Sequence, residues 1–121
     1  MATIRKFEDI IAWQRARSIN KLIYAATDNG KFARDFGLRD QIRRSAVSIM
    51  ANIAEGFARR SDKDFAYFLN IARSSAAEVQ SHLYVALDQG YLPQAEFDAI
   101  YAELEEVSRM IYGFARHLIS K

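Results

Sequence analysis

A row of polar side chains interrupts the apolar stretch VSIMANIAEGFARRS, residues 47–61. Asn52 and Glu55 lie inside the apolar run, and Arg59 and Arg60 follow it. On a helix with 100° per residue, one row opposite the apolar face contains Asp40, Arg44, Ser48, Asn52, Glu55 and Arg59. A carboxylate placed near a packed surface requires donors, because an unpaired buried charge is costly. The polar row is therefore a candidate for a structural contact between helices or for a functional site.

A polar clasp that fixes helix register is the first interpretation of this row. Its middle consists of small side chains, which allow another helix to approach closely. Four arginines could donate to the carboxylate of Glu55: Arg44, Arg59, Arg60 and, on the next segment, Arg73. We expect a structural clasp made of Asp40, Ser48, Asn52, Glu55 and Arg73. A functional site and a solvated polar face are the alternatives.

Arginine supplies 12 of the 17 basic residues, and it suits planar contacts with carboxylate or phosphate better than lysine does. Residues 1–60 carry 12 Lys/Arg against 6 Asp/Glu, whereas residues 61–121 carry 5 against 9. This asymmetry fits a basic half that packs against an acidic half, and it also fits an anionic partner such as RNA or DNA. The candidate contacts are Arg39, Arg43, Arg44, Arg59 and Arg60. The alternative is that internal salt bridges between the two halves use these arginines.

Metal and catalytic motifs are weak in this sequence. Glu78 and His82 have Glu-x-x-x-His spacing, whereas di-iron bundles use Glu-x-x-His. There is no cysteine, and no nucleophile with a base partner, phosphate loop or zinc pattern occurs. We therefore expect no enzyme activity, no catalytic residue, no metal and no cofactor. The alternative is a metal-dependent enzyme built on a helical bundle.

The length of 121 residues fits one domain, 1–121. Half of the residues are hydrophobic and 26% are charged, which is typical of globular proteins. No apolar run approaches the ~18 residues of a membrane span. The first ten residues contain charges and no apolar core of a secretory signal. We expect a cytoplasmic protein that does not enter a membrane.

The apolar residues predict an all-α fold. The segments 62–89 and 93–119 carry apolar residues at alternating steps of three and four. This spacing forms the seam of a left-handed supercoil. Leu104 lies in the middle of the last seam. The sequence predicts an antiparallel up-and-down four-helix bundle. Its helices are expected at about 8–28, 38–58, 62–89 and 93–119.

Glycine and capping residues set the expected boundaries. Gly30 and Gly37 bracket an expected loop, and Asn29-Gly30 is expected to end the first helix. Gly56 lies just before FARRSDKD, close to the expected end of the second helix at residue 58. Residues expected to cap or start helices are Ser61, Asp62 and Pro93.

Apolar residues outside the seams predict contacts between subunits. Four such residues lie in the segment 93–119 and three in the segment 62–89. One bundle core cannot bury all seven of them. They are Tyr101, Met110, Tyr112 and Ile119, and Phe68, Ile71 and Tyr84. Scattered exposed aromatic residues are the alternative.

Residues 36–79 contain DQIRRSAVSIMANIAEG followed by FLNIARSSAAEV. These motifs resemble the bacterial four-helix-bundle family of 23S rRNA intervening sequence proteins, which is also described as an S23 ribosomal protein family. The flanking FEDIIAWQRA and GYL fit as well, so the resemblance covers nearly the whole chain. The family name reflects genes that lie inside insertions in 23S rRNA genes.

The resemblance implies an oligomer and a partner. Related proteins form ring-like homopentamers. One relative, the accessory variability determinant of diversity-generating retroelements, is a basic pentamer that binds nucleic acid and partners a reverse transcriptase. No catalysis is established for the family. Together with the arginines of the second helix, the resemblance implies a non-catalytic homo-oligomer, a pentamer, that binds RNA or DNA through those arginines. The alternative is a structural or protein-binding ring without nucleic acid.

Overall fold

Six helical elements make up the fold in a computed structural model, which describes residues 3–120. They are η1 (Phe7–Asp9), α1 (Ile11–Ala26), α2 (Gly30–Arg34), α3 (Phe36–Phe57), α4 (Asp62–Asp88) and α5 (Gln94–Ile119). Within these residues the structure contains no strand. It therefore confirms the all-α prediction.

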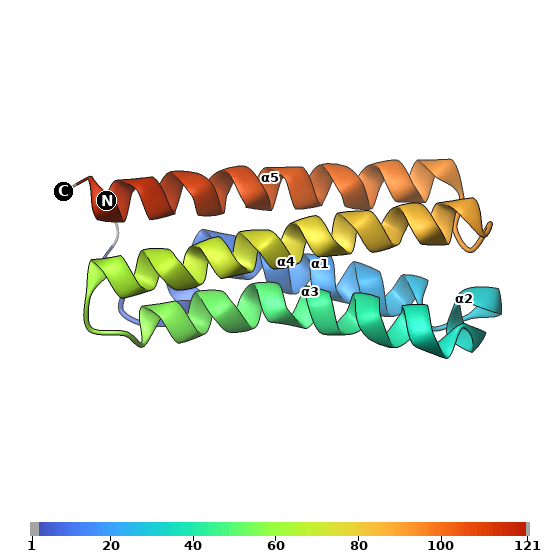
Figure 1. Cartoon of the computed structure of the whole chain (residues 1–121), viewed down its shortest axis with the longest axis horizontal. Coiled ribbons are helices and arrows are strands. Elements are labelled where there is room, and N and C mark those ends of the chain that lie inside the picture. The colour runs from blue at the N-terminus through green and yellow to red at the C-terminus, as the bar shows by residue number, and fades with distance from the viewer. Residues whose placement is uncertain (1–2, 121) are drawn as a thin grey trace.

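The four long helices form an antiparallel up-and-down bundle (Figure 1). Helix α4 has the most extensive contacts, with α3 on one side and α5 on the other. Helix α1 closes the ring by contacting α3 and α5. The diagonal pairs are therefore α1 with α4 and α3 with α5. Helix α1 is the shortest of the four, which leaves it the least extensively packed member.

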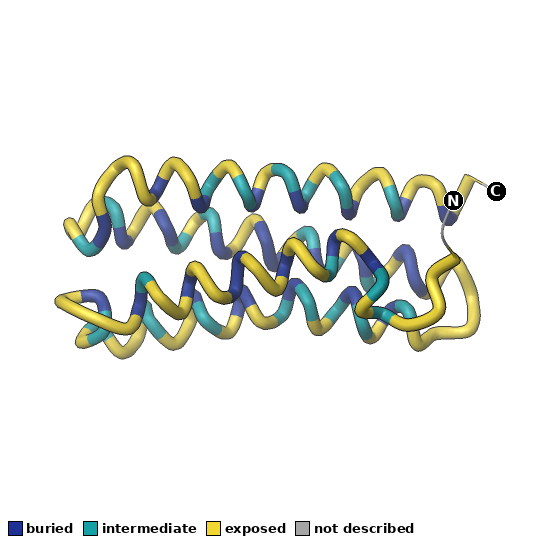
Figure 2. Tube along the Cα trace, turned by 180° about the vertical axis from the view of Figure 1, so that it is seen from behind, coloured by how far each residue is buried: buried dark blue, intermediate teal, exposed yellow. Residues whose placement is uncertain are grey.

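The core lies along the predicted seams, and buried positions recur along the inner side of each helix (Figure 2). Leu104 is fully buried, as its central place in the last seam predicts. The buried seam residues of α4 are Phe65, Leu69, Ala72, Ala76, Val79, Leu83 and Ala86. Three alanines are interspersed among the larger side chains of this row, and they let neighbouring helices approach closely.

Both boundaries predicted for the first helix, residues 8 and 28, are wrong. A turn of 3-10 helix precedes α1, and the extended backbone of Ile10 separates the two. Thr27 ends α1, so Asn29-Gly30 does not cap it. Asn29 instead precedes α2, and Gly30 has φ +65°, a conformation that favours glycine. The expected loop between Gly30 and Gly37 is thus mostly helical.

The other boundaries lie within two residues of their predictions. Ser61 accepts a hydrogen bond from the Asp64 N–H at 3.1 Å and so caps α4, as predicted. Pro93 immediately precedes the first residue of α5. Gly37 lies inside α3, where the prediction placed a loop end.

Gly56 lies near the end of α3, inside the helix predicted at about 38–58. It is buried. A Cβ atom at this position would lie 2.8 Å from Phe65 Cδ1 and 2.8 Å from Phe68 Cβ. The glycine therefore permits close packing of α3 against the start of α4, and its role is steric.

The end of the bundle near α2 is tied together by Asp35. One carboxylate oxygen accepts the Leu38 N–H at 3.2 Å and so caps α3. The other accepts the hydroxyl of Tyr91 at 2.9 Å, and this bond raises the pKa of Tyr91. The Tyr91 ring also stacks on the buried Phe32 of α2. Helix α2 is thus held against the α4–α5 connection.

The apolar residues outside the seams are only partly accommodated. Tyr84, Tyr112 and Ile119 are exposed. The other four of the predicted set are half-buried: Phe68, Ile71, Tyr101 and Met110. Within residues 3–120, no helix combines the length and the apolar character needed to cross a bilayer.

Candidate functional site

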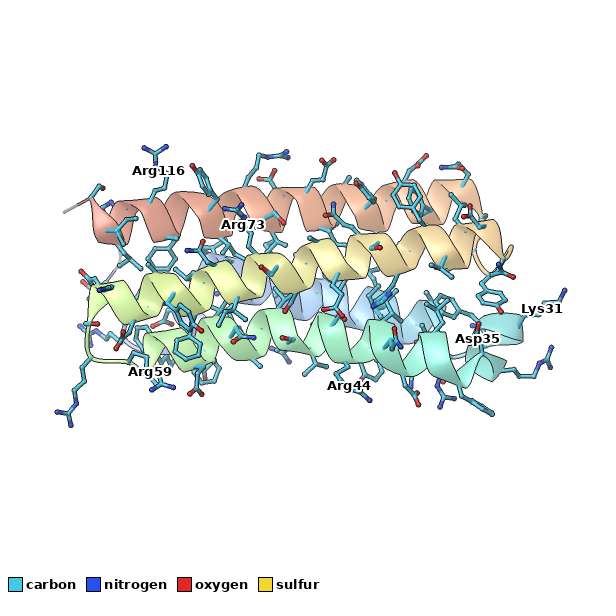
Figure 3. The ribbon with its side chains drawn as sticks, viewed as in Figure 1. Lys31, Asp35, Arg44, Arg59, Arg73 and Arg116 are labelled. Atoms are coloured by element: carbon cyan, nitrogen blue, oxygen red, sulfur yellow. The ribbon has the colours of Figure 1, made fainter. Side chains whose placement is uncertain are left out.

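The five candidate arginines fall into two groups along α3. Arg39, Arg43 and Arg44 lie in its first half, whereas Arg59 and Arg60 lie just beyond its end. Arg44 and Arg59 are 15 residues apart in sequence. This spacing corresponds to about 22 Å along a helix axis. Figure 3 shows Arg59 near one end of the bundle and Arg44 well inside α3. The five therefore cannot form one cluster within a single chain.

Arg43 is fixed by two contacts with α1 and its C-terminal cap. Its Nε donates to Thr27 Oγ1 at 2.7 Å, and its guanidinium lies 4.5 Å from the centre of the Tyr24 ring. Thr27 is itself buried and donates to the carbonyl of Ile23. A guanidinium has five N–H donors, and this arrangement uses one of them. Arg43 is thus held in place with donors to spare.

Arg44 is exposed and makes no hydrogen bond or ion pair with any residue from 3 to 120. It lines a shallow groove of about 400 Å³ with Tyr24, Asp40, Arg43 and Val47. This groove lies between α1 and α3. Arg44 therefore contributes a full positive charge to a concave surface.

Helix α1 adds further positive charge beside this groove. Arg17, Lys21 and Tyr24 are spaced four and three residues apart and so share one side of α1. Arg17 and Lys21 are both exposed. We call Arg17, Lys21, Tyr24, Arg43 and Arg44 the α1/α3 basic face. Its α1 members escaped the sequence prediction, although their spacing in RARSINKLIY was a usable signal.

Arg39 is less available than its neighbours. Its Nε donates to Asp40 at 2.9 Å, and one Nη donates to the carbonyl of Ala33 at 3.1 Å. Its guanidinium also lies 4.8 Å from the centre of the Phe36 ring. Arg39 thus pairs with the carboxylate of Asp40, which is the acidic side chain that lines the nearby groove. Asp40 is therefore paired with Arg39 and not with Arg43 or Arg44. The basic face therefore retains its positive charge.

The expected polar clasp forms only in part. Ser48 Oγ lies 2.8 Å from Ser75 Oγ across the α3/α4 interface. Asn52 donates to the carbonyl and the hydroxyl of Ser48 at 2.8 and 2.9 Å. Ser75 was not in the predicted set, although it lies in the small-residue run ARSSAAEV. The bonds join small side chains, which allow α3 and α4 to approach closely.

The other three residues of the expected clasp lie elsewhere. Glu55 is exposed and pairs with Arg59 at 2.7 Å, one turn away. Arg73 lies 4.7 Å from the centre of the Tyr112 ring on α5 (Figure 3 labels Arg73 between α4 and α5). Asp40 pairs with Arg39. Glu55 is exposed, and Arg59, just beyond the end of α3, is the arginine that pairs with it.

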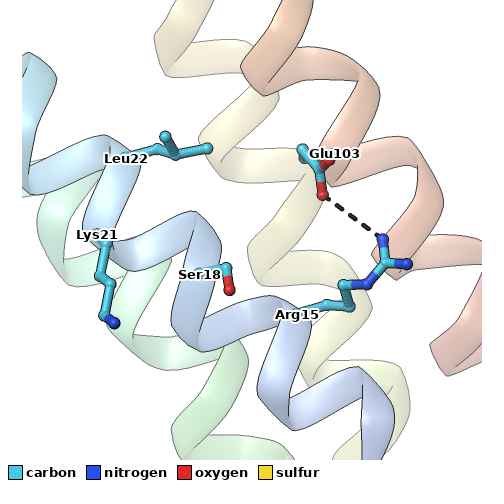
Figure 4. A pocket seen from close by; sticks show the side chains of 5 residues that line it. All are labelled: Arg15, Ser18, Lys21, Leu22 and Glu103. Atoms are coloured by element: carbon cyan, nitrogen blue, oxygen red, sulfur yellow. Dashed lines mark ion pairs between the residues drawn. The ribbon is translucent and has the colours of Figure 1, made fainter.

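A second groove, of about 540 Å³, lies between α1 and α5 (Figure 4). An ion pair crosses it from Arg15 to Glu103 at 3.7 Å. Both side chains are nearly half exposed, so solvent screens their attraction. The remaining lining residues are Ser18, Lys21 and Leu22. This groove presents no arrangement of nucleophile and base.

Glu78 and His82, whose spacing only weakly resembles a metal motif, form one long contact in the structure. His82 Nε2 lies 3.6 Å from a carboxylate oxygen of Glu78, and it has no hydrogen-bond partner. Within residues 3–120 there is no group of three or more His, Asp or Glu side chains that could hold a metal ion.

Comparison with protein families agrees with the motifs of α3 and α4. A family model described as 23S rRNA-intervening sequence protein matches residues 8–113. The chain belongs to this family. The matched region contains the whole α1/α3 basic face and the Ser48–Ser75 contact, whereas His117 and Leu118 lie outside it.

A solved structure shares the fold of this 23S rRNA-intervening sequence protein. It is a crystal structure of a protein of unknown function from the S23 ribosomal protein family of Bacteroides thetaiotaomicron. The TM-score is 0.78, with 25% sequence identity, over 85% of this chain and 96% of that one. A comparison with curated proteins finds no match.

The α1/α3 basic face is the best candidate site in this family member. It combines a fixed arginine, an unpaired arginine and an exposed aromatic ring in one groove. Such a surface can donate hydrogen bonds to phosphate oxygens and stack an unpaired base. Chemistry that requires a general base has only Asp40 in this groove, and Asp40 is paired with Arg39.

Proposed function

We propose that this protein is a non-catalytic, homo-oligomeric nucleic-acid-binding protein whose α1/α3 basic face contacts phosphates. The observation that carries the proposal is the fixed Arg43 beside the unpaired Arg44. Fixing a guanidinium before binding lowers the conformational entropy lost on complex formation. RNA or DNA as the ligand would place the protein in the cytoplasm.

The chemistry of the face favours single-stranded nucleic acid. Tyr24 is 43% exposed, and the guanidinium of Arg43 covers part of its ring. Exposed aromatic rings beside cationic side chains stack the bases of single strands, whereas paired bases are not accessible for stacking. The proposed contact set is Arg17, Lys21, Arg43 and Arg44 on phosphates and Tyr24 on a base.

Assembly into a ring would strengthen this weakly charged chain. The formal net charge is only +2 per chain. A closed ring repeats the same face once per subunit, so the local fields of several faces add. Exposed apolar side chains such as Tyr84, Tyr112 and Ile119 provide contact surface for assembly. The pentameric number is an inference from the family resemblance.

The test compares two double variants that remove the same charge. Arg43→Gln with Arg44→Gln removes the centre of the basic face. Arg109→Gln with Arg116→Gln removes two arginines from α5 as a matched control. Affinity for a short mixed-sequence single-stranded RNA is measured by fluorescence anisotropy. We expect a loss of about tenfold or more in the first variant only, because each lost charged hydrogen bond is worth on the order of 1.5 kcal/mol or more.

A protein-binding ring scaffold is the second candidate function, and one observation favours it. Tyr24 and Val47, two exposed apolar residues, line the same groove as the arginines. If another subunit or a protein partner such as a reverse transcriptase covers this groove, the arginines are not free for RNA. The Arg43/Arg44 variant would then change the mass in solution or partner capture, and the wild type would not bind RNA at low salt.

A further inference from the structure

A cavity of about 770 Å³ lies at the end of the bundle where α1 begins and α5 ends. Figure 1 shows this end, which also contains the α3–α4 connection. Ligand pockets in proteins commonly have volumes of about 300–1,000 Å³. The cavity is therefore large enough for a small molecule, and it is distinct from the α1/α3 basic face.

The wall of this cavity is mainly apolar. Three phenylalanines contact one another in a row: Phe57 and Phe65 have ring centres 6.1 Å apart, and Phe65 and Phe114 have ring centres 5.1 Å apart. Ile11 lines the same cavity and is 56% exposed, although it is a large aliphatic side chain. An occupant with a hydrocarbon chain would remove this apolar surface from water, which is favourable in proportion to its area.

The charged groups around the cavity differ in whether they have partners. Asp9 accepts hydrogen bonds from the backbone N–H groups of Arg5 and Lys6, at 3.1 and 3.2 Å. Arg60 and His117 also line the cavity, and neither side chain has a hydrogen bond or ion pair with any residue from 3 to 120. The donors left available for an occupant therefore include two basic side chains.

We infer that this cavity binds a small aliphatic carboxylate, such as a medium-chain fatty acid. The hydrocarbon chain would lie against Ile11, Phe65 and Phe114. The carboxylate would accept hydrogen bonds from Arg60 and His117 at the rim. An apolar wall with a few convergent polar groups is the usual composition of small-ligand sites. A carboxylate also matches the planar guanidinium of Arg60.

The test uses isothermal titration of the full chain with decanoate. We expect saturable binding with one decanoate per chain, and weaker binding of 1-decanol, which has the same chain length without charge. Arg60→Gln should weaken decanoate binding by about tenfold, because a charged hydrogen bond is lost. Arg34→Gln removes an exposed arginine of α2 at the opposite end and should leave binding unchanged.

A second pair of variants tests the apolar wall. Ile11→Glu places a carboxylate in the cavity and should abolish decanoate binding, while circular dichroism verifies the fold. Leu22→Glu changes another exposed apolar residue of α1, outside the cavity, and should bind decanoate like the wild type. The inference is overturned by absent or non-saturable binding, by equal affinity for decanoate and 1-decanol, or by equal losses in variant and control.

Discussion

Arg43 illustrates how neighbouring side chains decide what a residue can do. Sequence spacing placed Arg39 and Arg43 one turn apart and gave them equal roles. In the structure, Arg39 donates to Asp40 and to a backbone carbonyl, whereas Arg43 uses one donor on Thr27 and stacks on Tyr24. The carbonyl belongs to Ala33 of α2, and Tyr24 and Thr27 belong to α1 and its cap, so the difference depends largely on tertiary packing.

Two glycines of the long helices should respond in opposite ways to the same substitution. Gly56→Ala forces a methyl group to within 2.8 Å of Phe65 and Phe68. Overpacking of this kind typically costs about 1–3 kcal/mol. Gly113→Ala meets no atom within 4 Å and lies in α5. It should stabilise the chain by up to about 1 kcal/mol, because alanine is a better helix former. Urea unfolding measures both, and equal effects would contradict this packing.

Tyr91 should make stability depend on alkaline pH. Its hydrogen bond to Asp35 raises its pKa above the ordinary value of 10.0 in the folded state. The folded chain therefore holds this proton more tightly than the unfolded chain does. The resulting stability is fully present below pH 10.0 and is lost as the pH rises through the raised pKa.

The measurement compares melting temperatures of the wild type and Tyr91→Phe across that range. The wild type should melt higher at neutral pH, because it retains the bond to Asp35. This difference should shrink above pH 10.0 as Tyr91 ionises. A difference that stays constant through the alkaline range would show that the bond does not contribute.

At the scale of elements, the sequence was most informative for α4 and α5. Their apolar residues recur over seven positions each, and such long regular seams leave few alternatives to a buried helix face. Helix α2 has five residues, which is too short for a periodic signal, and so it was mistaken for a loop. The sequence could not show why residue 56 is glycine, because the reason is the close approach of Phe65 and Phe68 from α4.

The candidate site was less predictable than the fold for a related reason. The helical wheel of α3 placed the polar residues on one arc, but part of that arc is packed, because Ser48 and Asn52 are half-buried. It could not show that the Ser48 side faces α4 while the Arg43 side faces α1, since that depends on the order of helices in the bundle. For the same reason Thr27, Tyr24 and Ser75 were missed.

The α3/α4 interface should depend on Asn52 more than on Glu55. Asn52 is half-buried and holds Ser48 in its contact with Ser75, so Asn52→Ala should cost about 1 kcal/mol, the usual net value of a hydrogen bond. Glu55→Ala removes an exposed pair one turn apart and should cost no more than about 0.5 kcal/mol. Chemical denaturation compares the two, and a larger loss for Glu55 would contradict this assignment.

At the scale of the whole molecule, the proposed oligomer connects the exposed apolar residues with the modest charge. We expect multi-angle light scattering on dilute protein to give about 69 kDa, which is five times the chain mass of 13.8 kDa. The reason is the apolar surface that the bundle leaves exposed on α1, α4 and α5. A mass of 13.8 kDa, that of one chain, would contradict the oligomer. A mass of another whole number of chains would contradict only the pentamer.

The central claim is that the α1/α3 basic face binds single-stranded nucleic acid through phosphate contacts. The most direct measurement is the affinity of the wild-type protein for a mixed-sequence single-stranded RNA over a series of salt concentrations. Each neutralised phosphate releases counterions, so log affinity should fall linearly with log salt, with a slope of roughly −0.7 per contact. Two to four contacts on one face predict a slope between about −1.4 and −2.8. No binding at low salt, or an affinity that does not change with salt, would contradict the claim.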